Sequence, residues 1–218
     1  MGTRGILISL EGCDGCGKST QGALLCERLA AEGYPVGPSR APGSVIREPG
    51  DTDVGEAIRR VLLHGSARPT PWTEALLYAA ARAELVATVL LPELARGRVL
   101  VLDRFVDSSL AYQGCARSLG IDEVLAVNRP GLRGVMPDLT LVLDIDPAIA
   151  LTRAGEAPDH IEAEGSELQR RVAAGYVELA RRFPERIRSI DGSRDVATIA
   201  AEIQTLVLAA LAGWSAER

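Results

Sequence analysis

The feature that most constrains this chain is a glycine-rich turn of eight residues. Residues 12–19 read Gly-Cys-Asp-Gly-Cys-Gly-Lys-Ser and satisfy the pattern G-x-x-x-x-G-K-[S/T] in full. The apolar run before them, at residues 6–10, predicts a buried strand, and residues 20–32 predict a helix that ends at Gly33. Such a turn between a strand and a helix predicts a phosphate-binding loop.

Each part of this loop has a physical task in binding phosphate. Glycines let backbone N–H groups converge on phosphate oxygens, and the N-terminus of the next helix adds positive potential. Lys18 can reach the outer phosphates of a nucleoside triphosphate, and Ser19 can ligate Mg²⁺. The candidate ATP-binding residues are Gly12, Cys13, Asp14, Gly15, Cys16, Gly17, Lys18, Ser19 and Thr20.

Lys18 is the only lysine in the chain. Of the 24 basic residues, the other 23 are arginine. Because a planar guanidinium does not replace a compact ammonium at a point-charge site, a lysine at this position supports the phosphate role. A GTP-binding switch would read guanine with an Asn-Lys-x-Asp segment, which a chain whose sole lysine is Lys18 cannot contain. A motor or regulatory ATPase stays open as an alternative.

The rest of the chain alternates predicted strands and helices. Apolar runs predict strands at residues 99–103, 139–146 and 187–190, with a short strand near Val45 and Ile46. Helices are predicted at residues 53–64, 72–96, 166–182 and 196–211. This alternation predicts an α/β fold with a parallel sheet covered on both faces and a ligand at the carboxyl ends of its strands. We expect residues 1–218 to form a single domain with a small mobile lid.

Charge and composition limit the partners. The chain has 24 basic and 29 acidic residues and a net charge of −5, without a dense basic run, which argues against a nucleic acid partner. We find no run of 18 or more apolar residues and no secretory signal pattern, so we expect no membrane span. Four cysteines in 218 residues do not make a disulfide scaffold. A cytoplasmic location is therefore expected.

Five motifs in consistent order give the chain a family resemblance. Besides the loop at residues 11–20, they are Arg-Glu-Pro-Gly at 47–50, EALLYAAAR at 74–82, Asp-Arg-Phe at 103–105 with Ala-Tyr-Gln-Gly at 111–114, and Pro-Asp-Leu-Thr at 137–140. Together they resemble the thymidylate kinase family across nearly the whole chain. The resemblance implies a three-layer P-loop fold, transfer of the γ-phosphoryl of ATP to dTMP, a need for Mg²⁺, and a homodimer paired through long helices. A kinase for another nucleoside or nucleoside monophosphate is the nearest alternative.

Phosphoryl transfer needs cations near both phosphates and a carboxylate that organises Mg²⁺ or its waters. Asp103 ends a predicted strand and suits the carboxylate role, with Ser19 as the other metal ligand; a turn or helix-cap aspartate is the alternative. Arg47 and Arg104 suit bidentate grips on the acceptor phosphate. For Arg47 a solvated loop charge is the alternative. The candidate catalytic residues are Lys18, Asp103, Arg104 and Arg153.

The resemblance assigns further residues to the nucleoside monophosphate. It places Asp14 at the deoxyribose 3′-hydroxyl, Arg82 at the edge of the base, and Tyr112 where a side chain crowds the ribose 2′ position. Tyr78 lies where an aromatic ring stacks on thymine, although a tyrosine on an apolar helix face is more often part of the core. The resemblance also places Ser109 and Gln113 on either side of the base. The full substrate-binding set is Asp14, Arg47, Tyr78, Arg82, Arg104, Tyr112, Ser109 and Gln113.

The chain departs from the family pattern in two places. Residues 37–44 form an insertion, and Asp51 stands where glycine is usual. In the expected lid, at about residues 153–165, Arg153 is the only arginine where the family carries several, and Gly155 and His160 hold the other places. We therefore expect Arg153 to supply the lid's cation.

Cys13 and Cys16 form a C-x-x-C pair inside the loop. A zinc site is weakly supported because a second pair of ligands is missing from the pattern, and a thioredoxin-like site has different surroundings. We favour the interpretation that small residues fill these loop positions. Oxidation to a disulfide that distorts the loop is a further hypothesis, which backbone strain opposes.

Overall fold

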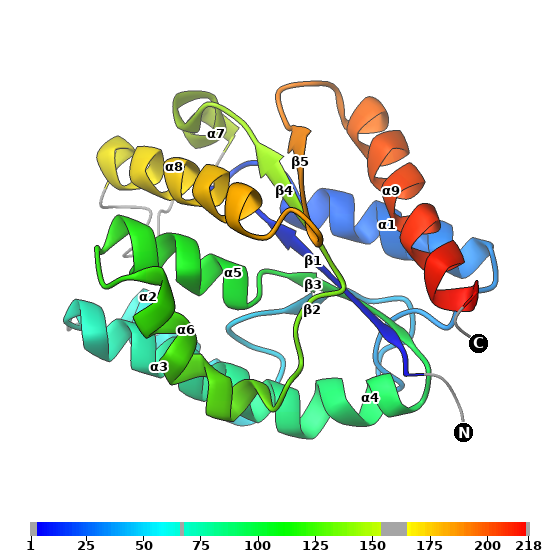
Figure 1. Ribbon diagram of the computed structural model, residues 1–218, viewed down its shortest axis with the longest axis horizontal. Coiled ribbons are helices and arrows are strands. Elements are labelled where there is room, and N and C mark those ends of the chain that lie inside the picture. The colour runs from blue at the N-terminus through cyan, green and yellow to red at the C-terminus, as the bar shows by residue number, and fades with distance from the viewer. Residues whose placement is uncertain (1–3, 66–67, 154–164, 217–218) are drawn as a thin grey trace.

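A parallel sheet of five strands runs through the middle of the molecule (Figure 1). The computed structural model describes residues 4–65, 68–153 and 165–216. The strands are β1 (Ile6–Glu11), β2 (Ile46–Arg47), β3 (Val99–Asp103), β4 (Leu139–Asp144) and β5 (Ile187–Asp191), in the spatial order β2-β3-β1-β4-β5. The strands predicted from apolar runs are all present, and the α/β prediction is confirmed.

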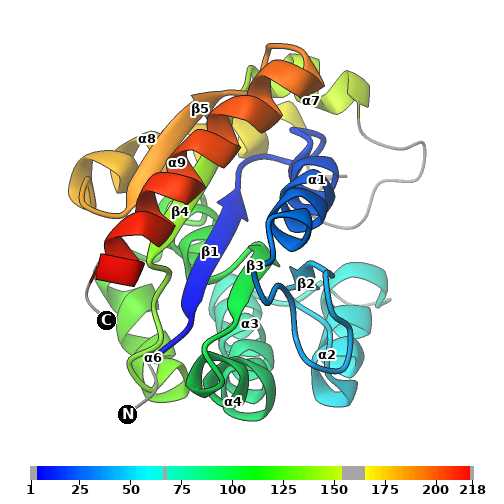
Figure 2. The ribbon, with the colours of Figure 1, turned by 90° about the vertical axis from the view of Figure 1, so that its right-hand side faces the viewer.

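Alternate residues of β1 pack into two different cores, as the period of a strand requires. Ile6, Ile8 and Leu10 face a core that includes α1 (Lys18–Ala31) and α9 (Val196–Ala216). Leu7 faces the opposite core, which includes α3 (Pro71–Leu85), α6 (Ile121–Leu132) and α8 (Ser166–Arg182). Figure 2 shows α1 and α9 in front of the sheet and α3 and α6 behind it. Helices thus cover both faces of the sheet.

The long helix predicted at residues 72–96 consists of three joined segments. α3 continues into the π-helical η1 (Val86–Leu90) and then into α4 (Leu91–Ala95). Pro92 lies near the start of α4. Because proline has no N–H and its ring crowds the preceding turn, a regular helix would be strained there. The wider π turn just before Pro92 accommodates it without ending the helix.

Several helical segments had no clear signal in the sequence, whereas α2 (Asp53–His64) and α8 have their predicted bounds. The unpredicted segments are α5 (Val106–Ser109), the π-helical η2 (Leu110–Ala116), α6 and α7 (Pro147–Arg153). α6 contains Pro130 and Gly131, which are poor helix formers. A Cβ on Gly131 would lie 2.6 Å from the Cβ of Ala83 in α3. The glycine is therefore needed for α6 to lie close against α3.

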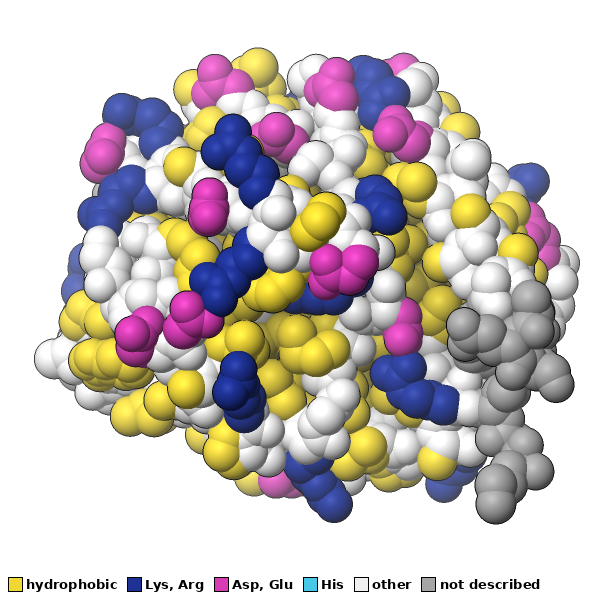
Figure 3. All heavy atoms as spheres, viewed as in Figure 1, with side chains coloured by type: hydrophobic (Ala, Val, Ile, Leu, Met, Phe, Trp, Pro, Cys, Tyr) yellow, Lys and Arg dark blue, Asp and Glu magenta, His cyan; other side chains and the backbone are white. Residues whose placement is uncertain are grey.

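Two helical stretches, Pro71–Ala95 and Val196–Gly213, are long and apolar enough to cross a membrane by length and composition alone. The sequence contains no run of 18 or more consecutive apolar residues, and each stretch owes its hydropathy to apolar residues interspersed with a few polar ones. Here the first stretch buries Arg82 and Leu85, and the second buries Ile203 and Val207. Core helices of globular proteins pass the same test, so the indication is weak. Figure 3 shows arginines interspersed with acidic side chains on one face of the molecule.

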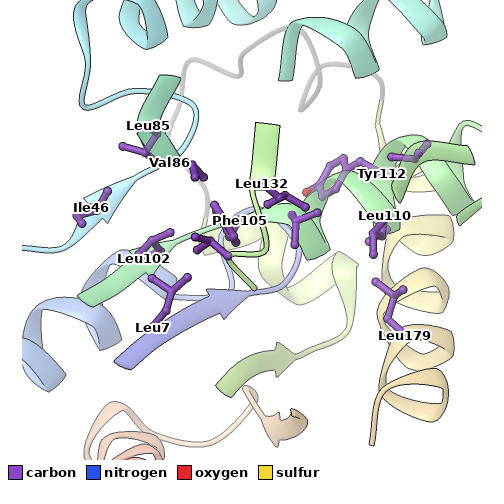
Figure 4. Close-up of a cluster of buried hydrophobic side chains, with 14 of the residues drawn as sticks. Leu7, Ile46, Leu85, Val86, Leu102, Phe105, Leu110, Tyr112, Leu132 and Leu179 are labelled. Atoms are coloured by element: carbon purple, nitrogen blue, oxygen red, sulfur yellow. The ribbon is translucent and has the colours of Figure 1, made fainter. Parts of the chain in front are cut away.

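The carboxyl ends of three strands bring separate loops to one edge of the sheet. Leu10 at the end of β1 and Arg47 at the end of β2 both pair with Asp103, the last residue of β3. Close behind these ends, Phe105, Leu102 and Ile46 belong to one buried cluster (Figure 4). A rigid core therefore holds the three loops in a fixed relation.

Candidate active site

The loop between β1 and α1 has the backbone conformation that its glycines permit. Gly12 has a φ of +138°, and a Cβ there would lie 2.7 Å from the carbonyl oxygen of Leu143. Gly17 has a φ of +100° and directly precedes α1. Positive φ values at both ends let the loop curl back over the helix N-terminus, where backbone N–H groups lack helical partners.

The side chain of Lys18 lies inside this loop. Nζ donates hydrogen bonds to the carbonyl oxygens of Cys13 at 2.9 Å and Gly12 at 3.3 Å, and it lies 3.7 Å from Sγ of Cys16. Lys18 is buried except for 7% of its surface. The ammonium is held at the mouth of the loop by weakly charged partners, which phosphate oxygens can replace.

Ser19 and Asp103 meet beside the loop. Oγ of Ser19 donates a 2.6 Å hydrogen bond to Oδ2 of Asp103. Two oxygen-bearing side chains, one from the first turn of α1 and one from the end of β3, are thereby brought together. Within the described residues there is no group of three or more His, Cys, Asp or Glu side chains that could hold a metal ion. A cation here would take its other ligands from water and phosphate, which is the usual situation for Mg²⁺.

Arg104 connects the phosphate loop to the helical layer. Its Nη2 forms an ion pair with Asp14 and donates to the hydroxyl of Tyr112 at 3.2 Å, while Nη1 donates to Oγ of Ser108 at 3.0 Å. The backbone of Arg104 has a φ of +71°, which is uncommon outside glycine and costs free energy. The surrounding contacts hold Arg104 in this conformation at the end of β3, directed into the site.

Asp14 accepts several hydrogen bonds at once. Besides Arg104, the Tyr112 hydroxyl donates to Oδ2 at 3.1 Å, and Nε2 of Gln169 in α8 does so at 3.1 Å. Burial alone would raise the pKa of Asp14, but the charges of Arg104 and Lys18 outweigh it and lower the pKa below its usual value. Asp14 is thus a carboxylate acceptor at neutral pH.

Glu11, which the sequence analysis did not select, is fully buried beneath the site. Its carboxylate accepts hydrogen bonds from the backbone N–H of Phe105 at 2.8 Å, from Oγ of Ser108 at 2.5 Å and from the hydroxyl of Tyr176 at 3.0 Å. Burial raises the pKa of Glu11. This residue ties the start of the phosphate loop to α5 and α8. Its immediate position before the loop was the only signal in the sequence.

Arg82 is almost completely buried and has four partners. Nε donates to Oε2 of Glu48 at 3.1 Å, and Nη1 donates to Oδ1 of Asn128 at 2.5 Å. Nη2 donates to the carbonyl oxygen of Phe105 at 3.2 Å and to Oγ of Ser109 at 3.1 Å. Neither Glu48 nor Asn128 was selected as a site residue from the sequence.

A cavity of about 360 Å³ opens at this edge of the sheet. Most of the predicted site residues line it: Asp14, Gly15, Lys18, Ser19, Arg47, Tyr78, Arg82, Asp103, Arg104, Ser109, Tyr112 and Gln113. The lining also includes Glu48, Phe105 and Arg59, which were not among the predicted site residues. Arg59 extends from α2 and donates to the carbonyl oxygen of Pro49 at 3.0 Å. Nothing in the local sequence distinguishes it from the other arginines.

Arg153 is placed apart from this cavity lining. It ends α7, is exposed, and its Nη1 donates to the carbonyl oxygen of Gly192 at 3.1 Å. Residues 154–164 of the expected lid, including Gly155 and His160, lie outside the described residues. Of the remaining predicted ATP-binding residues, Gly12, Cys13, Cys16 and Gly17 belong to the loop and Thr20 to the first turn of α1, and none of them lines the cavity.

The two loop cysteines are free and buried. A hydrogen bond between their thiols, together with the charge of Lys18, lowers the pKa of Cys16 to about 6, while the pKa of Cys13 is raised. Outside the loop, Asp51 has a φ of +57°, which explains why glycine is usual there. Oδ2 of Asp51 accepts the backbone N–H of Arg47 at 2.7 Å, so this aspartate stabilises the turn it occupies.

The sequence matches the family model described as thymidylate kinase over residues 10–203. The chain is 50% identical to the thymidylate kinase of Pelotomaculum thermopropionicum, over 88% of this chain and 87% of that protein. It is 45% identical to the thymidylate kinase of Caldanaerobacter subterraneus subsp. tengcongensis, over 90% and 91% of the two chains. The thymidylate kinase of Leifsonia xyli subsp. xyli is 48% identical, over 92% and 93%. This chain therefore belongs to the thymidylate kinase family.

Proposed function

We propose that this protein transfers the γ-phosphoryl group of ATP to dTMP, giving ADP and dTDP. The observation that carries the proposal is that a phosphate-binding loop and an aromatic, arginine-lined pocket share one cavity. Lys18 and Ser19 line one part, and Tyr78 and Arg82 of α3 line another. Membership of the thymidylate kinase family supports the same reaction.

On the donor side, the loop and Lys18 bind the outer phosphates, and Ser19 and Asp103 would hold Mg²⁺. Their oxygens lie 2.6 Å apart and are the hard ligands that this ion prefers. Bound there, Mg²⁺ would neutralise charge on the phosphates. We infer that Asp103 acts only through the metal and its waters, because phosphoryl transfer depends mainly on positioning and charge.

On the acceptor side, Arg47, Arg59 and Arg104 supply the cations for the monophosphate. All three line the cavity. Arg104 pairs with Asp14, so the phosphate grip and the proposed 3′-hydroxyl acceptor are parts of one hydrogen-bonded unit. In this proposal, Tyr78 stacks on thymine and Tyr112 excludes a 2′-hydroxyl. No covalent intermediate is needed.

Substrate profiling tests the function. Purified protein with ATP and Mg²⁺ should produce ADP rapidly with dTMP and slowly or not at all with dCMP, dGMP or thymidine. Mg²⁺ removal with a chelator should abolish turnover. ADP production that is independent of any nucleoside monophosphate would instead support a regulatory ATPase, and a preference for another monophosphate would change the assigned substrate.

We also propose a homodimer in the cytoplasm, formed through α2 and α3. Val54 and Val61 of α2 are 49% and 51% exposed, and Trp72 and Leu76 of α3 are 42% and 53% exposed. Because α2 packs against α3, we infer that these side chains belong to one apolar surface, which a second copy would cover. Light scattering should give twice the chain mass for the wild type and a monomer for Leu76→Arg. Val177→Arg, at an exposed apolar residue of α8, is the control and should stay dimeric.

A further inference from the structure

The Arg82 guanidinium is held on nearly all sides by its protein partners. Of its five N–H donors, Nε–H donates to Oε2 of Glu48. Nη2 lies 2.7 Å from Oε1 of the same carboxylate and donates its two hydrogens to Ser109 and the Phe105 carbonyl. Nη1 donates one hydrogen to Oδ1 of Asn128 at 2.5 Å. Among the described residues, nothing engages the second Nη1 hydrogen. Since Arg82 lines the cavity, that hydrogen is the donor left for a ligand.

Asn128 is itself fixed in one orientation. It lies in α6 with 2% of its surface exposed and does not line the cavity. Its Nδ2 donates to the carbonyl oxygen of Val124 at 2.8 Å, one turn earlier in the same helix. If the amide were flipped, its NH₂ group would face the guanidinium, and two donors would oppose each other. The hydrogen bonds to Arg82 and to the Val124 carbonyl oxygen would both be lost. Oδ1 therefore has to face Arg82.

The close packing of α6 on α3 makes this contact possible. Gly131, three residues after Asn128, lies against Ala83, the neighbour of Arg82 in sequence, with no space for a Cβ. A larger residue would push the helices apart and draw the acceptor away from Nη1. The position of Oδ1 is thus set by helix packing, in the way that buried partners orient a functional side chain.

We propose that Asn128 is a positioning residue that selects the base of the acceptor nucleotide through Arg82. With one Nη1 hydrogen bound to Asn128, the guanidinium offers the pocket a single fixed donor. Such a donor suits a pyrimidine carbonyl acceptor, as in thymine, and opposes the amino donor that cytosine carries at that position. The inference rests on the proposed function and adds a residue outside the pocket as a determinant of its selectivity.

Steady-state kinetics of Asn128→Leu and Asn128→Asp test the proposal. Leucine removes the acceptor at similar volume, so KM for dTMP should rise roughly tenfold to a hundredfold, the effect expected for losing a buried hydrogen bond to a charged group. KM for ATP should stay unchanged, and the preference for dTMP over dCMP should fall. Aspartate keeps an oxygen toward Arg82 and should recover part of the loss. Leu125→Ala, on the same helix, is the control and should lower thermal stability without changing the preference.

A double-mutant cycle separates this role from a structural one. In an Arg82→Met background, Asn128→Leu should change KM for dTMP by less than about twofold, because its effect passes through Arg82. Additive effects, or a wild-type KM in Asn128→Leu, would overturn the inference. If Asn128→Leu does not fold, Asn128→Ala takes its place in the cycle. Wild-type turnover of dTMP is measured first, so that failure of the proposed function and failure of this inference are distinguished.

Discussion

The ammonium group of Lys18 is the one lysine charge in the phosphate-binding loop. Nζ is held by the carbonyl oxygens of Gly12 and Cys13, which form hydrogen bonds to it without carrying a full charge. A point charge with three donors can exchange such partners for phosphate oxygens at nearly the same position. A guanidinium is larger and planar and does not replace a compact ammonium at such a site.

Lys18→Arg should therefore lose at least about 100-fold in kcat, in line with the loss of a preorganised electrostatic contact. The charge is retained, so the loss would reflect geometry. Single-turnover phosphoryl transfer measures it, and the melting temperature shows whether the variant is folded. A folded Lys18→Arg enzyme with nearly full activity would contradict the role assigned to Lys18.

Tyr78 provides a second test at the scale of one residue. It lines the cavity on α3, one helical turn before Arg82, so the two side chains share a face. If its ring stacks on the base, Tyr78→Ala should raise KM for dTMP about tenfold or more and leave KM for ATP unchanged. Leu77→Ala, at the neighbouring position, controls for general damage to the helix. Equal changes in KM for dTMP and KM for ATP would show that Tyr78 is part of the core and does not contact the base.

Among the elements, α7 and α8 come directly before and after the expected lid in the sequence. α8 sends Gln169 to Asp14 and Tyr176 to Glu11, so its position is coupled to the phosphate loop. α7 ends at Arg153, which contacts the turn after β5 through Gly192. Arg153, the cation expected in the lid, is therefore part of an anchored helix, and its side chain does not line the cavity.

We predict that Arg153→Ala is nearly as damaging to kcat as the loss of Lys18. Charge that develops on the transferred phosphoryl group needs a nearby cation, and one well-placed arginine contributes about 10³-fold or more. Rapid-quench measurement of the chemical step gives the effect. Arg181→Ala, in the last turn of α8, is the matched control and should keep wild-type kcat. If Arg153→Ala also keeps wild-type kcat, the assignment of the lid to these residues is wrong.

Considered as a whole, the molecule buries several charged side chains. Glu11, Glu48, Arg82 and Asp107 all have 2% or less of their surface exposed. Most of this charge is paired, as in the 2.7 Å contact between Nη2 of Arg82 and Oε1 of Glu48. Because burying a carboxylate costs free energy even when it is paired, the stability of the fold should depend on pH.

The ionisation of Glu48 sets the direction in which stability changes with pH. Burial raises its pKa from 4.5 to about 7 despite the opposing charge of Arg82. The folded state then binds this proton more tightly than the unfolded state, so Glu48 lowers the free energy of unfolding as pH rises from about 4.5 to about 7. Urea unfolding of Glu48→Gln should show a stability difference from wild type that grows over this range and is constant above it. Glu167→Gln, on the surface of α8, should show no such trend; a flat difference for Glu48→Gln would contradict the prediction.

The sequence by itself determined the sheet and the phosphate loop, whereas the pocket residues Tyr78, Arg82, Ser109, Tyr112 and Gln113 were implied only by the family resemblance. Strands are recognisable as apolar runs because both faces of a parallel sheet are buried. The loop is recognisable as a motif because its consecutive residues all contribute to binding phosphate. Asp103 and Arg104 could be assigned because strand ends in such a sheet meet at one edge. These features depend on local spacing, which the chain displays directly.

Only the tertiary structure decided which side chains support that lining. Asn128 contacts Arg82 across 46 positions of sequence, and Gln169 contacts Asp14 across 155. α6 forms despite its proline and glycine because packing against α3 outweighs intrinsic propensity. Arg153, assigned to the lid from the sequence, lies against Gly192 instead of in the cavity. Contacts between distant segments leave no periodic or spaced pattern in the chain, so they become visible only when the helices and strands are packed.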